Sequence, residues 1–198
     1  MNIRNSRLLN ARYSIKSSLA SALLLAIAAT AGPSAAAMDN PERQWSHKDW
    51  YAEYKDGHCA ISTGGDGSGR FSIELEQGGL NGSASYLPIV YSSEPLPLRE
   101  DDGFALIIDH NVTDFGDEMS YYDGPDPYGR FMVGAALTGG FVPDLIAAFR
   151  KGNAVSVQVK HSGEPARIVD DFSLSGFTAA YLKIAQWCDF DPDDLFES

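Results

Sequence analysis

The feature that most constrains the fold is an apolar-faced helix predicted near the C-terminus, over residues 177–188. Apolar side chains recur there at helical spacing, so that one whole face of the helix is apolar: Phe177, Ala180, Tyr181, Ile184, Trp187 and Cys188. Such a face needs a partner surface. Cys188, at the end of the helix, is one of only two cysteines in the chain, and the other is Cys59.

The first 37 residues have the composition of a secretory leader. Basic residues precede an apolar run at 19–29, and the small residues 35–37 form an A-x-A cleavage site. That run is shorter than the roughly 20 residues that span a bilayer. We therefore expect a signal peptide over 1–37, a single β-rich domain over 38–188 and an acidic C-terminal tail over 189–198. The protein is expected to be periplasmic or secreted, with no transmembrane segment once the leader is removed.

Export bears directly on the two cysteines, because exported proteins fold in an oxidising compartment where cysteines usually pair. We predict a disulfide between Cys59 and Cys188 that fastens the C-terminal helix to the first strand. A bridge that closes a loop of this length contributes on the order of 4 to 5 kcal/mol in the chain-entropy account.

The charge of the chain limits its partners. Four of its 15 basic residues and none of its 27 acidic residues lie in the predicted leader. The rest of the chain therefore has 11 basic and 27 acidic residues, a formal charge of −16. A nucleic-acid binder needs a basic surface, so nucleic acid is excluded as a partner. We expect an unknown protein or another envelope component instead.

Strand patterns dominate the predicted domain. Apolar residues alternate with polar ones at 50–55, 70–76 and 154–160, as in half-buried antiparallel strands. The glycine-rich run 64–69 predicts a hairpin turn, and 141–152 predicts a short helix. The fold class is therefore mostly β, an antiparallel β-sandwich or flattened barrel with one short helix and a C-terminal helix.

An acidic turn between two predicted strands is the best candidate for a metal site. Oxygen ligands of this kind suit calcium, although Asp and Asn are also common in turns because their side chains bond their own backbone. The candidate ligands are Asp109, Asn111, Asp114, Asp117 and Glu118. Calcium is the only cofactor that the sequence suggests.

An aromatic and acidic segment, predicted to be a loop, is the candidate binding surface. Tyrosines on a loop stiffened by proline present contact area at low entropic cost. The candidate residues are Tyr121, Tyr122, Asp123, Asp126 and Tyr128. The other interpretation is that these are ordinary surface residues of a hairpin with no binding role.

Catalytic signatures are missing from the sequence. The four histidines are scattered, and no serine of the mature chain has glycine at both −2 and +2. The sequence therefore favours an exported, non-enzymatic envelope protein that acts as an interaction or binding module. The alternatives are a structural or accessory envelope protein that binds a cation, and a hydrolase whose site is assembled from distant strands.

Several short motifs resemble the invasion-associated locus B family of exported alphaproteobacterial proteins. The resemblance covers mainly residues 141–182, through the helix that ends at Gly152, the strand at 155–157 and the segment 172–180, with an echo at 49–61. The additional cysteines of that family have no counterpart here. The resemblance implies a β-rich envelope or secreted protein linked by its family name to host-cell invasion, and it brings no catalytic residues.

Overall fold

The computed structural model describes residues 42–65, 69–79, 81–91, 95–114, 119–125 and 129–194. All of them belong to one compact unit, Asp39–Ser198. The predicted signal peptide over 1–37 and residues 195–198 of the predicted tail lie outside the described residues.

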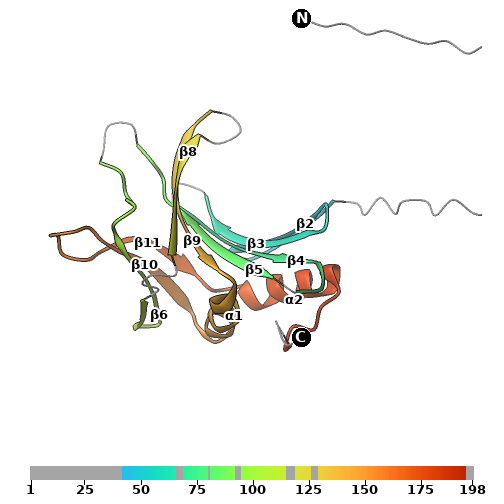
Figure 1. Cartoon of the computed structure of the whole chain (residues 1–198). Coiled ribbons are helices and arrows are strands. Elements are labelled where there is room, and N and C mark those ends of the chain that lie inside the picture. The colour runs from blue at the N-terminus through green and yellow to red at the C-terminus, as the bar shows by residue number, and fades with distance from the viewer. Residues whose placement is uncertain are drawn as a thin grey trace, which may run out of the picture. The chain divides into compact units, whose positions relative to one another are not determined.

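The strands form two antiparallel sheets (Figure 1). The larger sheet consists, in spatial order, of β1 (Arg43–His47), β2 (Trp50–Lys55), β3 (His58–Gly64), β4 (Arg70–Glu76), β5 (Gly82–Leu87), β9 (Phe131–Thr138) and β8 (Met119–Pro125). The smaller sheet consists of β11 (Arg167–Ser173), β10 (Ala154–Lys160), β6 (Gly103–Ile108) and β7 (Asn111–Asp114).

The predicted sandwich is confirmed, and the flattened-barrel alternative is wrong. After β5 the chain crosses to the smaller sheet, where β6 pairs with β10 and β7. Each sheet therefore ends on two edge strands among the described residues, and the sheets do not close.

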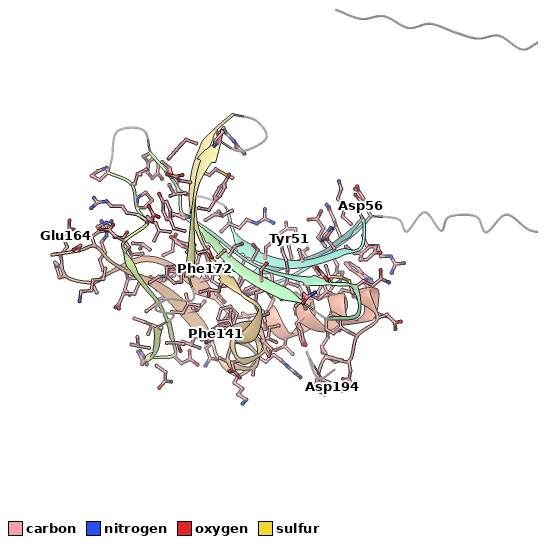
Figure 2. The ribbon with its side chains drawn as sticks, in the orientation of Figure 1. Tyr51, Asp56, Phe141, Glu164, Phe172 and Asp194 are labelled. Carbon is pink, nitrogen blue, oxygen red and sulfur yellow. A yellow bond between two sulfur atoms is a disulfide. The ribbon has the colours of Figure 1, made fainter. Side chains whose placement is uncertain are left out.

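Alternation of side chains decides which face of each strand lies inside. On β2, Trp50, Ala52 and Tyr54 are buried, whereas Tyr51 is 61% exposed. Phe172 of β11 is buried within the domain, as Figure 2 shows together with exposed Tyr51. The alternation predicted for residues 50–55 is confirmed.

Three strands, β1, β7 and β8, were not predicted as strands. β1 and β7 are short and polar, and they are held by two-residue hairpin turns rather than by a burial pattern. The turn between β6 and β7 consists of Asp109 and His110, both with positive φ (46° and 74°). Two successive positive φ angles are the signature of a type I′ turn, which matches the right-handed twist of paired strands.

The described residues also contain two α-helices and two 3₁₀ turns. α1 (Val142–Lys151) follows a 3₁₀ turn, Gly139–Phe141, and a second such turn is Gln77–Gly79. α2 (Phe177–Cys188) begins after Gly176, whose φ is +100°. A Cβ at Gly176 would collide with the backbone oxygen of His47, so only glycine allows the helix to start here. No described helix is long and apolar enough to cross a membrane.

The apolar face of α2 packs on β2 and β3, below the larger sheet in Figure 1. The rings of Trp50 and Phe177 meet edge to face at 4.8 Å, and Phe149 of α1 lies 5.3 Å from Phe177. The indole nitrogen Nε1 of Trp50 donates to the backbone oxygen of Ser173 at 2.9 Å, which satisfies the one polar atom of this buried side chain.

The predicted disulfide between Cys59 and Cys188 is confirmed, with a Cα–Cα distance of 6.4 Å. Its position differs from the prediction, because Cys59 lies on β3 rather than on the first strand. The difference arises because β1 and β2 form a hairpin before the chain reaches Cys59.

The start of the predicted acidic tail lies against both helices. Phe190 packs on the ring of Tyr181 at 5.9 Å, and the Tyr181 hydroxyl donates to the backbone oxygen of Pro192 at 2.9 Å. Arg150 Nη1 pairs with Asp193 Oδ1 at 2.8 Å. Residues 189–194 therefore extend the packing of α2 on α1.

Candidate functional site

The predicted binding loop is, in its described part, a strand. Tyr121, Tyr122 and Asp123 lie on β8, which pairs with β9 and forms one edge of the larger sheet. Asp126 and Tyr128 lie outside the described residues. The loop prediction was wrong here because it gave more weight to the proline and glycine residues than to the strand propensity of two adjacent tyrosines.

The two tyrosines face opposite sides of β8. Tyr121 is half-buried against the core, and burial raises the pKa of its hydroxyl above the ordinary value. Tyr122 is 45% exposed and lies opposite Gly134. In Figure 1 the β8–β9 hairpin reaches away from the rest of the larger sheet. Tyr122 is thus the part of the predicted surface that a partner could contact, and its role in binding stays a prediction.

The predicted metal residues are only partly described. Both carboxylate oxygens of Asp109 accept hydrogen bonds, at 3.0 to 3.1 Å, from the backbone and side chain of Asn153 and from the backbone of Ala154. Desolvation opposes ionisation of Asp109, but these hydrogen bonds lower its pKa below the ordinary value. Asp109 thereby ties the β6–β7 turn to the end of α1.

Asn111 donates its amide hydrogens to the backbone oxygens of Ile108 and Asp109 at 3.4 Å. The side chain of Asp114, and Asp117 and Glu118, lie outside the described residues. Within the part of the chain that the structure describes, no group of three or more His, Cys, Asp or Glu side chains could hold a metal ion. A cation here would compete with the Asn153 and Ala154 N–H groups, and calcium binding stays a prediction.

A buried Asp–His pair resembles part of a hydrolase site. His161 Nδ1 lies 2.5 Å from Asp102 Oδ1, and both side chains are almost fully buried, with exposed fractions of 3% and 0%. His161 Nε2 lies 2.7 Å from Nη2 of Arg167. Because a guanidinium can only donate, Nε2 must accept, and the neutral imidazole donates its Nδ1 hydrogen to Asp102.

Arg167 therefore donates a hydrogen bond to His161 Nε2. In a Ser–His–Asp triad this nitrogen takes the proton from the nucleophile. The same Asp102 also accepts from the backbone N–H of Arg99 at 2.7 Å. These contacts join the β5–β6 connection to the ends of β10 and β11. The arrangement is a structural tie, and sequence reasoning missed it because the two partners stand 59 residues apart.

A second buried polar contact, between the two sheets, does open to the surface. The register of β11 against β10 shifts so that Val157 faces Asp170 and Gln158 faces Ile168, which leaves Val169 unpaired in a β-bulge. Asp170 pairs with the buried Val157 and lies two residues from the buried Phe172, so alternation places it on the inner face of β11. Its Oδ2 accepts hydrogen bonds from the Tyr86 hydroxyl and from Gly69 N–H, the latter at 3.1 Å.

The pocket above this contact has a volume of about 160 Å³. We call it the Asp170 pocket, and its lining combines polar and apolar groups: Gly69, Tyr86, Pro88, Ile89, Tyr91, Pro97, Val169 and Asp170. The second carboxylate oxygen, Asp170 Oδ1, accepts no hydrogen bond from the described residues. It is the acceptor that remains free for a ligand.

Tyr86 and Asp170 form the floor of the pocket, and two aromatic rings and the backbone of Gly69 pack against them. The Tyr86 ring lies 6.0 Å from Phe104 and 6.2 Å from Phe172. Burial, and then the hydrogen bond to Asp170, raises the pKa of Tyr86, so that its hydroxyl stays protonated and donates. A Cβ at Gly69 would collide with Asp170 Oδ2 and lie 2.9 Å from the Tyr86 ring, so the backbone can approach only because residue 69 is glycine.

Sequence reasoning missed the Asp170 pocket. Gly69 was assigned only to a hairpin turn, and that turn does join β3 to β4. The available signal was the adjacent pair Asp170 and Asp171 in a strand, since alternation would send one of two neighbouring acids inward.

The fold and the site together define a disulfide-closed β-sandwich with a small pocket between its sheets. Neither a protein-family model nor a curated protein matches the sequence. Among solved structures, the crystal structure of invasion associated protein B from Bartonella henselae is similar, with a TM-score of 0.52 and 15% sequence identity. The match covers 73% of this chain and 96% of that chain. At this identity the likeness shows the fold alone, and it supports the predicted family resemblance at that level.

Proposed function

We propose that this protein is an exported envelope protein, periplasmic or secreted, that acts as a non-enzymatic binding module. Three features support the proposal: the leader-like composition of residues 1–37, the disulfide between Cys59 and Cys188, and the fold shared with invasion associated protein B. Disulfides persist mainly in oxidising compartments, which agrees with export.

The observation that carries the binding role is the preorganised carboxylate of Asp170. One of its oxygens accepts hydrogen bonds from Tyr86 and Gly69, and Asp170 lines a pocket together with several apolar side chains. Ligand sites typically combine apolar walls with a few well-placed polar groups. A glycine and a buried tyrosine both hold this one carboxylate.

A binding role fits the chemistry better than catalysis does. The Asp170 pocket offers a single carboxylate, whereas glycoside hydrolysis by paired acids needs two. The Asp102–His161 pair, which could have served a hydrolase, is covered by Arg167. The Asp102–His161 pair is therefore engaged in holding the fold.

The proposal is tested with the chain expressed in a bacterial host with its leader. We expect the protein in the periplasm or medium, with an intact mass that begins at Met38. The purified protein is then titrated, in ¹H–¹⁵N spectra, with small cations, carboxylates, phosphate, neutral alcohols and sugars. At least one class is expected to shift the amides of Gly69, Val169 and Asp170. Cytoplasmic retention, or amides that no class shifts, would contradict the proposal.

A further inference from the structure

We propose that the Asp170 pocket binds an alkylammonium group, of the kind that ends a lysine side chain or a free diamine. The inference rests on the proposed binding function and names the ligand class for that site. It follows from the charge, the remaining acceptor and the walls of the pocket.

The floor selects for a hydrogen-bond donor. Asp170 Oδ1 is the unused acceptor, while Gly69 N–H and the Tyr86 hydroxyl are already committed to Oδ2. An apolar ligand would bury Oδ1 without a partner, at a cost. An anion would face a carboxylate and find no free donor on the floor. A cationic donor gains a charge-assisted hydrogen bond.

The geometry favours an ammonium over a guanidinium. A guanidinium gains most from two parallel hydrogen bonds to both oxygens of a carboxylate. Asp170 Oδ2 already accepts two hydrogen bonds, so only Oδ1 is available. An ammonium is a compact point charge and bonds well to a single oxygen.

The walls suit the alkyl part of such a ligand. Pro88, Ile89, Pro97 and Val169 are apolar and offer contact to a methylene chain. Tyr91 is 56% exposed at the pocket, where its ring can attract a cation. The formal charge of −16 outside the leader adds a long-range attraction for cations.

The carboxylate is also placed before any ligand arrives. Hydrogen bonds from Gly69 and Tyr86 fix Asp170 within the described structure. A preformed site does not have to order its side chains on binding, which favours affinity for a small ligand.

The test is a titration of the exported, full-length mature protein followed by amide shifts at Gly69, Val169 and Asp170. The probes share one alkyl chain: n-butylammonium, n-butylguanidinium, butyrate and n-butanol. We expect butylammonium to bind at least about tenfold more tightly than butanol or butyrate, since a charged hydrogen bond exceeds the free energy of a factor of ten. Cadaverine and Nα-acetyl-lysine methylamide then distinguish a free diamine from a protein side chain, by which of the two binds more tightly.

Variants test whether butylammonium binds at Asp170. Asp170→Asn is expected to weaken butylammonium binding at least about tenfold, because the charge of the acceptor is lost. Asp171→Asn is the matched control, since Asp171 is exposed and lies outside the pocket. Tyr91→Ala is expected to weaken binding several-fold without a change in melting temperature, and it keeps the test valid if Asp170→Asn fails to fold.

Two results would overturn the inference and leave the proposed function standing: butanol or butyrate binding as tightly as butylammonium, or butylguanidinium binding more tightly. If none of the probes, and no sugar or phosphate, shifts the pocket amides, the inference and the proposed function both fail.

Discussion

The hydroxyl of Tyr86 on β5 donates a hydrogen bond to Asp170 on β11, and this contact joins the two sheets of the sandwich. The partners are 84 residues apart in the chain. The same contact forms the floor of the Asp170 pocket, so stability and binding depend on one pair of side chains.

Removal of the hydroxyl should therefore destabilise the fold. Tyr86→Phe is expected to lower the free energy of unfolding by about 1 to 3 kcal/mol, because a charged acceptor loses a buried partner. Urea unfolding of both proteins measures the difference. Tyr122→Phe is the control, because Tyr122 is 45% exposed and its change should be close to zero. Equal losses in the two variants would show that the contact between the sheets adds no stability.

The pH dependence of stability follows from the raised pKa of two buried tyrosines, Tyr86 and Tyr181. Burial is the main cause in both. Above the unfolded-state pKa of about 10, the unfolded chain loses these protons while the folded chain keeps them, so stability falls as pH rises. Unfolding should therefore need less urea from about pH 10 upward, and Tyr86→Phe should show a shallower decline. A decline of the same slope in Tyr86→Phe would contradict the assignment to Tyr86.

On the acid side, Asp109 should contribute with the opposite sign. Its folded-state pKa is lowered, so its contribution is present above the ordinary carboxyl pKa of about 4 and is lost as pH falls through the lower folded value. Asp109→Asn should weaken the acid dependence of the melting temperature. Asp101→Asn, at an exposed position, is the comparison and should behave as the wild type does. If the melting temperature of Asp109→Asn falls with pH as steeply as that of the wild type, the hydrogen bonds from Asn153 and Ala154 do not have this role.

The disulfide should be a main source of stability, because Cys59 and Cys188 are 129 residues apart. Its loss is expected to cost about 4 to 5 kcal/mol in the chain-entropy account. Urea unfolding with and without reductant, and of the double variant Cys59→Ser, Cys188→Ser, measures this. Two free thiols in the non-reduced protein, or a midpoint that reductant does not move, would contradict the bridge.

The buried tie between Asp102 and His161 should be purely structural. His161→Ala leaves the Asp102 carboxylate, which is 0% exposed, without its main partner and should cost about 3 to 5 kcal/mol of stability. His58→Ala, at an exposed strand position, should cost little. A His161→Ala protein as stable as the wild type would refute the tie.

Local patterns in the sequence predict the scaffold of this domain well. Alternation identified the buried valines Val155, Val157 and Val159, and helical spacing identified the face of α2 that packs on β2 and β3. Two cysteines in a chain with a predicted leader were enough to predict the bridge. These features are predictable because each depends on residues close in sequence or on a pair without alternatives.

The pocket could not be predicted in the same way. It depends on a glycine that lets the backbone approach and on Tyr86 in the other sheet. Alternation would send one of the two adjacent acids of β11 inward, but the groups that this acid meets come from distant segments and are set by tertiary packing. Tyr121 and Tyr122 were assigned to a loop because the neighbouring proline and glycine residues outweighed their own strand propensity, although they pair with β9.

The most direct test of the account observes the carboxylate itself. The side-chain ¹³C resonance of Asp170 can be assigned by its absence in Asp170→Asn and followed while n-butylammonium is added. We predict a saturable shift of this resonance, a much smaller one with n-butanol, and no shift of the Asp171 carboxylate. An Asp170 resonance that does not move, in a protein that is folded, would contradict the claim that this pocket is a binding site for alkylammonium groups.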